Sequence, residues 1–257
     1  MKRHFIVHGC VVLAMLIMLS GSFVACAGGA DKTTGETRGI EFPDEALEAV
    51  IRELLVSFRG PILAEHLLEI SQINGTREGI KDLTGIENCT ATTHIWLPDN
   101  EIVDLTPVMH LTQLRRLYLS GNKIEDISVL AGLIDLKGFS AGDAVEDISV
   151  VAGMTELTTL AVSGPFSDIS AVANLTLIRT LTFDDSQVSD LSVLANGLTK
   201  LTRLNLRNCP VSDIRPLVDN PNLRKGLFID LRGCPLSDKS INEYIPELLE
   251  RGVRIAQ

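Results

Sequence analysis

Hydrophobic positions recur along this chain in one short pattern that repeats about every 22 residues. The pattern is L-x-L-x-x-N-x-I-x-D-I, and clear copies start at Ile95, Leu117, Phe139, Leu160, Leu181 and Leu204, with degenerate copies at Ile73 and Ile229. The spacings between successive starts are 22, 22, 22, 21, 21, 23 and 25 residues. So many copies at nearly constant spacing exclude coincidence and predict one structural unit repeated about eight times.

Each copy opens with alternating apolar and other residues, which predicts a short strand with its apolar side chains facing inward. About 22 residues per copy is too long for hairpins, so successive strands should stack in parallel and bury their apolar faces against their neighbours. The pattern is identified as a leucine-rich repeat. The predicted fold is therefore an α/β repeat solenoid, with a curved parallel sheet on its concave face and short 3-10 or helical segments on its convex face.

The period and the DIS-x-L and DLS-x-L convex segments resemble the internalin-like class of leucine-rich repeats, and both ends extend the resemblance. FPDEALEAVIRELL (42–55) and GPILAEHLLEI (60–70) resemble its helical N-terminal cap, and PLSDKSINEYIPELLERGVRI (235–255) resembles its closing segment. Pro43 suits a helix start, and the apolar helix face consists of Leu47, Val50, Ile51, Leu54 and Leu55. Ser237 or Asp238 can cap a helix that ends before Gly252.

The first residues are typical of a secretory signal, with a basic MKRH start and a nine-residue apolar run at 11–19. The stretch FVAC that ends at Cys26 resembles the bacterial lipobox, in which the cysteine receives a lipid; an ordinary cleaved signal is the alternative. The expected organisation has five parts: 1–25 lipoprotein signal peptide, 26–40 flexible tether, 41–70 helical N-terminal cap, 71–234 about eight repeats, and 235–257 C-terminal cap. We therefore expect a lipid-anchored protein on the membrane, facing outside the cytoplasm.

The formal charge of −10, without a run of Lys or Arg, argues against a nucleic-acid partner. The acids include one column of seven, at residues 82, 104, 126, 147, 168, 190 and 213. A calcium rail is one interpretation of this column. The other is that each Asp accepts backbone N–H groups of the convex turn that follows it, and the strict repetition favours this structural role.

The Asn position of the pattern begins as Asn100 and Asn122 and then drifts to Asp143, Gly164, Ser186, Cys209 and Cys234. In the family this side chain bonds inside the turn, so the later coils should have a weaker ladder. Cys209 and Cys234 fall in adjacent coils and are either two free thiols or a disulfide, whereas Cys89 takes a buried leucine-type position.

Nothing in the pattern indicates catalysis, because His66, His94 and His110 fall on different elements and no nucleophile, phosphate-binding or zinc motif is present. We expect no enzyme activity, no cofactor and no metal. The outward strand positions offer the candidate site instead, and they form columns of neighbours from coil to coil. One end of the face carries His94, Trp96, Arg116 and Tyr118, and the other carries Arg203, Arg207 and Arg232 beside Asp184 and Asp230.

Trp, Tyr and Arg are the residues that most often dominate binding energy. The expected function is therefore protein–protein interaction through the concave face, and the alternative is a structural or glycan-binding role in the cell envelope. Two further interpretations stay open. Trp96 and Tyr118 could pack on one another or under the cap, and the three arginines could be neutralised by the two aspartates.

Overall fold

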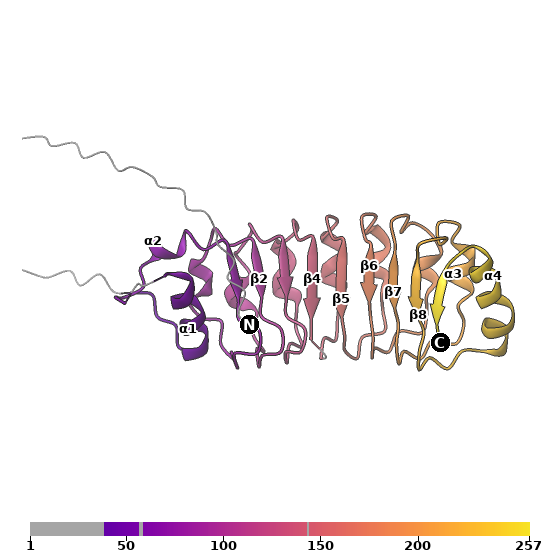
Figure 1. Cartoon of the computed structure of the whole chain (residues 1–257), viewed down its shortest axis with the longest axis horizontal. Helices are drawn as coiled ribbons and strands as arrows, with labels where there is room; N and C mark the ends of the chain where they lie inside the picture. Colours follow the sequence, from indigo (N-terminus) through magenta and orange to yellow (C-terminus); the bar gives the residue numbers. More distant parts are fainter. Residues whose placement is uncertain (1–38, 57–58, 143) are drawn as a thin grey trace, which may run out of the picture. The chain divides into compact units, whose positions relative to one another are not determined.

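The computed structural model describes residues 39–56, 59–142 and 144–257. Nine parallel strands form one sheet and follow in chain order from β1 to β9 (Figure 1). Their bounds are β1 Gln72–Asn74, β2 His94–Trp96, β3 Arg116–Tyr118, β4 Gly138–Ala141, β5 Thr159–Val162, β6 Thr180–Thr182, β7 Arg203–Asn205, β8 Phe228–Asp230 and β9 Arg254–Ala256. The predicted repeat solenoid is confirmed, and β9 is one strand more than the eight pattern copies predict.

The strand register places equivalent residues of successive coils side by side. Ile95 pairs with Leu117, while the flanking pairs are His94 with Arg116 and Trp96 with Tyr118. The central apolar residue of each strand from β1 to β8 is fully buried. Because side chains alternate along a strand, the residues on either side of it face outward, as the pattern predicts.

Short helical segments cover the opposite side of the sheet and join one strand to the next. They are 3-10 helices at η1 Ile86–Asn88, η2 Thr106–Val108, η3 Ser128–Gly132, η4 Ser149–Gly153, η5 Ser170–Asn174 and η6 Ser192–Ala195, followed by an α-helix, α3 Arg215–Asp219. Every Asp of the repeated column accepts the backbone N–H of the residue two positions later, at 2.7–2.8 Å. The predicted capping role of these aspartates is confirmed.

The ladder at the Asn position weakens along the chain. Asn100 is buried and makes six hydrogen bonds, three of them from the N–H groups of residues 78–80. The side chain of Asn122 makes three hydrogen bonds. The hydroxyl of Ser186 makes two, with Val188 N at 3.4 Å and with the Cys209 thiol at 3.3 Å. Asp143 lies outside the described residues. The loss of amide groups thus removes bonds from the later turns, as expected.

The N-terminal end of the solenoid is covered by α1 Glu45–Leu54 and α2 Ala64–Leu67. The N-cap of α1 is Asp44, one residue after Pro43, and its side chain accepts the N–H of Leu47. The sequence places Leu54 on the buried face of this helix, and that assignment is wrong: its side chain is 40% exposed. The core is contacted by the buried Leu47, Val50 and Ile51, and Leu55 packs against it while remaining partly exposed.

At the other end, η7 Ser240–Tyr244, a π-helical segment, continues into α4 Ile245–Glu250. Ser237, one of the two residues predicted to cap this helix, accepts the N–H of Ser240 through its hydroxyl oxygen at 3.2 Å. Gly252 then has φ +83°, a left-handed conformation that glycine adopts without strain. This turn sends the chain back alongside β8, which creates β9 and places Arg254 beside Phe228.

Candidate interaction surface

Four outward side chains of β2 and β3 form one cluster, which we call the aromatic patch: His94, Trp96, Arg116 and Tyr118. The His94 and Trp96 rings stack with centroids 5.4 Å apart and planes 13° apart. The Trp96 and Tyr118 rings lie 5.5 Å apart at a tilt of 40°. All four residues of the predicted N-terminal site therefore lie together, because β2 and β3 are in register.

The patch is held in place by a chain of hydrogen bonds that runs from Arg116 to the backbone. Arg116 Nη1 lies 3.3 Å from His94 Nε2, and His94 Nδ1 lies 2.8 Å from the Thr93 hydroxyl, which donates to Ser71 O at 3.0 Å. A guanidinium can only donate, so His94 Nε2 must be the acceptor and Nδ1 must carry the proton. Burial and the neighbouring Arg116 charge both lower the pKa of His94, which favours this neutral form.

The contact between Trp96 and Tyr118 matches one of the open interpretations, since the two rings do pack on one another. Both side chains nevertheless remain partly exposed, as does His94, and Arg116 is exposed. Rings that support each other and still face solvent lose little conformational freedom when a ligand covers them. The cluster is therefore an ordered surface rather than part of the core.

Tyr118 also leans over the next strand. A Cβ built on Gly138 would overlap the Tyr118 hydroxyl, so the glycine leaves the space that the ring occupies. All four residues of β4 are buried, and the Ser140 hydroxyl accepts the N–H of Leu119 at 3.2 Å. Gly138 thus makes room for a residue of the aromatic patch, and the sequence pattern did not single it out. Its position in the outward column, as the register partner of Arg116, is the sequence feature that could have indicated this role.

The arginines at the C-terminal end divide into two kinds. Arg207 pairs with Asp184 at 2.8 Å, and Arg232 pairs with Asp230 through both its Nε and its Nη2. Hydrogen bonding from Arg232 lowers the pKa of Asp230 despite its burial. Neutralisation, one of the two open interpretations, therefore holds for Arg207 and Arg232. Arg203 differs, since its guanidinium lies 5.1 Å from the centroid of the Phe228 ring.

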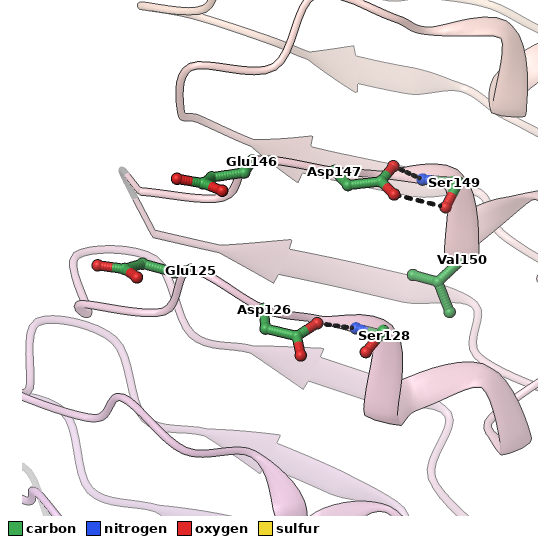
Figure 2. A pocket seen from close by; sticks show the side chains of 7 residues that line it. All are labelled: Glu125, Asp126, Ser128, Glu146, Asp147, Ser149 and Val150. Carbon is green, nitrogen blue, oxygen red and sulfur yellow. Dashed lines mark hydrogen bonds between the residues drawn. The ribbon is translucent and has the colours of Figure 1, made fainter.

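The convex side has an acidic crevice between two coils, lined by Glu125, Asp126, Ser128, Glu146, Asp147, Ser149 and Val150. Figure 2 shows each Asp directed at the serine two residues later, where it accepts the backbone N–H at 2.7 Å. In Asp147 the second carboxylate oxygen also accepts a hydrogen bond, from the Ser149 hydroxyl at 2.9 Å. Within the described ranges, no group of three or more His, Cys, Asp or Glu side chains could hold a metal ion.

The cysteine thiols are used inside the fold. Cys209 donates to Phe183 O at 3.0 Å, and Cys234 donates to Leu206 O at 2.9 Å, each reaching back to the preceding coil. Both are free thiols, as is the buried Cys89. Burial raises the pKa of Cys234 to about 11 and that of Cys89 to about 12. Protonated thiols are poor nucleophiles and poor metal ligands, so these cysteines are structural.

Known proteins match this arrangement at the level of both sequence and structure. The family model for the Leucine Rich Repeat matches residues 113–133. Internalin C2 of Listeria monocytogenes has a TM-score of 0.74 and 29% identity, over 84% of this chain and 94% of that one. A second internalin of Listeria monocytogenes, inlF, has a TM-score of 0.74 and 28% identity, over 84% of this chain and 63% of that one. No curated protein matches the sequence.

The repeated coil, its Asp caps and the matching family model define the class: this is a leucine-rich-repeat protein. Within that class it is internalin-like, because the similarity to the two internalins extends over most of the chain. Across the part of the chain that the structure describes, no helix is both long and apolar enough to span a membrane.

Proposed function

We propose that this protein is a non-catalytic binding protein whose concave face recognises another protein, with the aromatic patch as the main contact. One observation carries the proposal. The only tryptophan of the chain lies between the rings of His94 and Tyr118 on the outward face of the sheet, partly exposed and supported by both neighbours. A buried aromatic anchor of this kind contributes about 2 kcal/mol or more to binding. Arg116 and His94 would supply the polar contacts around it.

The experiment compares partner capture by the tagged full chain and by its Trp96→Ala/Tyr118→Ala variant from envelope extracts. The matched control is Ile134→Ala/Leu249→Ala, which removes two exposed apolar side chains outside the concave face. We expect the patch variant to lose the captured protein and the control to retain it. Equal capture by the folded patch variant would sink the proposal. Because Trp96 is the sole tryptophan, its fluorescence should also change when the purified partner is added.

The glycan-binding alternative rests on a separate observation. The rings of His94 and Trp96 are stacked with their planes 13° apart, and Gly138 of the neighbouring coil has no side chain to project from the face. Aromatic rings beside a flat polar surface are also suited to stacking against sugar rings. Binding to purified cell-wall polysaccharide that depends on Trp96, with no protein captured, would favour this function over the first.

We further propose that Cys26 carries a lipid and anchors the protein to the membrane, on the side that faces away from the cytoplasm. Cys26 and the segments 1–25 and 26–38 lie outside the described residues, so the support is the FVAC sequence and the preceding apolar run. Labelled fatty acid should enter the wild-type chain and not Cys26→Ser. Incorporation into Cys26→Ser would show that the cysteine is not the lipid site.

A further inference from the structure

The C-terminal end of the concave face holds a second cluster that uses a residue from β9. Arg203, Phe228 and Arg254 are register partners on β7, β8 and β9. The Arg203 guanidinium lies 5.1 Å from the centroid of the Phe228 ring, and the Arg254 guanidinium lies 5.9 Å from it. One partly buried ring thus supports two exposed arginines, and we call these three residues the arginine clamp.

The two arginines of the clamp carry charge that the rest of the face does not neutralise. The nearby carboxylates are taken, Asp184 by Arg207 and Asp230 by Arg232. Among the residues that the structure describes, neither Arg203 nor Arg254 forms an ion pair. The ring face offsets part of their mutual repulsion, since it attracts cations. Two uncompensated positive charges therefore flank the Phe228 ring on a chain whose net charge is −10.

Within the described part of the chain, neither the Arg203 nor the Arg254 guanidinium donates a hydrogen bond or forms an ion pair, so the N–H donors of both remain available. Each guanidinium carries five N–H donors in one plane. Such groups bind carboxylates through two parallel hydrogen bonds. Strands that are two steps apart are separated by about 10 Å, so carboxylates on one extended segment could meet both arginines.

We propose that the arginine clamp binds the carboxylate side chains of an acidic segment on the protein partner. This inference rests on the proposed function and names the chemistry of the partner at the far end of the same face. The clamp is six strand steps from Trp96, or about 29 Å at 4.8 Å per step. The partner would therefore present its acidic segment about 30 Å from the surface that covers the aromatic patch.

The test uses a fluorescein-labelled deca-glutamate peptide and the full chain at low ionic strength, with fluorescence anisotropy as the readout. We expect deca-glutamate to bind more tightly than deca-glutamine, and binding to weaken at least fivefold in Arg203→Gln/Arg254→Gln. The matched control is Lys81→Gln/Lys123→Gln, which removes the same charge from two exposed lysines of the first coils. It should change binding less than twofold.

Two further variants examine the geometry of the clamp. Arg203→Lys/Arg254→Lys keeps the charge but removes the planar donors, so we expect it to bind more weakly than wild type and more tightly than the glutamine variant. Phe228→Leu removes the ring that orders both arginines and should also weaken binding. All variants are compared by circular dichroism to establish that they are folded.

Several results would overturn the proposal. One is that wild type and Arg203→Gln/Arg254→Gln bind deca-glutamate equally well, and another is that wild type binds deca-glutamine as tightly as deca-glutamate. Clamp-dependent binding of polygalacturonate without binding of deca-glutamate would assign the site to an acidic glycan and also reject the protein segment. The peptide assay does not involve the aromatic patch, so Trp96→Ala/Tyr118→Ala should bind deca-glutamate normally. Failure of the clamp is thereby distinguishable from failure of the proposed function.

Discussion

The Tyr118 ring lies over Gly138 of the adjacent strand, in the space that any larger residue at position 138 would need. The register partner of Tyr118 is Ser140, so the ring leans diagonally back along β4 instead of pointing straight out. Trp96 contacts the other side of the ring. The aromatic patch therefore depends on a missing side chain in the next coil as much as on its own residues.

Gly138→Ala should rearrange the aromatic patch with little loss of stability. The added Cβ would overlap the Tyr118 hydroxyl, which is the far end of a side chain that can rotate away, so we expect a cost of about 1 kcal/mol or less. The displaced ring would change the surroundings of Trp96. The measurements are the emission spectrum of Trp96, the sole tryptophan, and the free energy of unfolding in urea.

Two comparisons make this prediction specific. Gly138→Ala combined with Tyr118→Phe should recover part of the wild-type Trp96 spectrum, because the closest overlapping atom is the hydroxyl oxygen. Gly142→Ala should behave differently and destabilise the fold strongly, because its Cβ would overlap the backbone of Asn122, which cannot rotate away. An unchanged Trp96 spectrum in Gly138→Ala would contradict the proposed support of the ring.

The outward columns could be predicted from sequence because two periods fix them. The strand period of two selects the outward residues, and the coil period aligns them from strand to strand, so His94, Trp96, Arg116 and Tyr118 follow directly. Neither period describes β9, since the segment around Arg254 lacks the repeat pattern. Its position follows from the helix before it and from the left-handed turn at Gly252.

The partners of the C-terminal arginine side chains could not be predicted from the sequence. Arg203 lies on β7 and Arg207 lies two residues beyond its end, and the two look equivalent in the pattern. Arg207 nevertheless pairs with Asp184, whereas Arg203 lies over the Phe228 ring. The choice depends on rotamers and on which carboxylate is already engaged. The same reasoning explains why the sequence left open whether the C-terminal arginines are neutralised.

The Asn ladder predicts graded losses of stability along the solenoid. Asn100→Ala would leave three backbone N–H groups and the Gly75 carbonyl without their partner, so we expect a loss of about 3 kcal/mol in the free energy of unfolding. Asn122→Ala removes half as many bonds and should cost about 2 kcal/mol. Ser186→Ala should cost less than about 1 kcal/mol. Urea unfolding measures all three, and similar losses in each would contradict a weakening ladder.

Asp44 should link the stability of the N-terminal cap to pH. Its carboxylate accepts the N–H of Leu47 in α1 and also those of Lys81 and Asp82 in the first coil. Burial acts to raise the pKa of Asp44, but these N–H groups together lower it below its usual 3.8. The unfolded chain therefore takes up the proton first as pH falls. The stabilisation is complete above pH 3.8 and is lost as pH falls through the lower folded pKa.

Asp44→Ala tests this link and should cost about 2 kcal/mol at pH 7. Asp44→Asn retains one acceptor oxygen and cannot titrate, so it should lose less at pH 7. The difference in free energy of unfolding between wild type and Asp44→Asn should then shrink between pH 4 and the folded pKa. Comparing the two proteins removes the contribution of the other carboxylates. A constant difference across that range would show that Asp44 titrates alike in both states.

His94 should titrate below its usual pKa of 6.5, because burial and the Arg116 charge both disfavour the imidazolium form. The groups that face it are Arg116, Thr93 and Trp96, and a proton on Nε2 would point at the Arg116 donor. Arg116→Gln should raise the pKa of His94, measured by NMR, but leave it below 6.5, since burial is the larger cause.

The lowered pKa of His94 also links stability to pH. Between the folded pKa and 6.5 the unfolded chain holds more protons, so the free energy of unfolding rises with pH across this window, and the stabilisation is complete above pH 6.5. Acidification should thus free Arg116 from His94 before the protein unfolds, and Trp96 emission should follow the same titration. A pKa at or above 6.5, or one that Arg116→Gln leaves unchanged, would contradict the neutral Nδ1–H form of His94 in the aromatic patch.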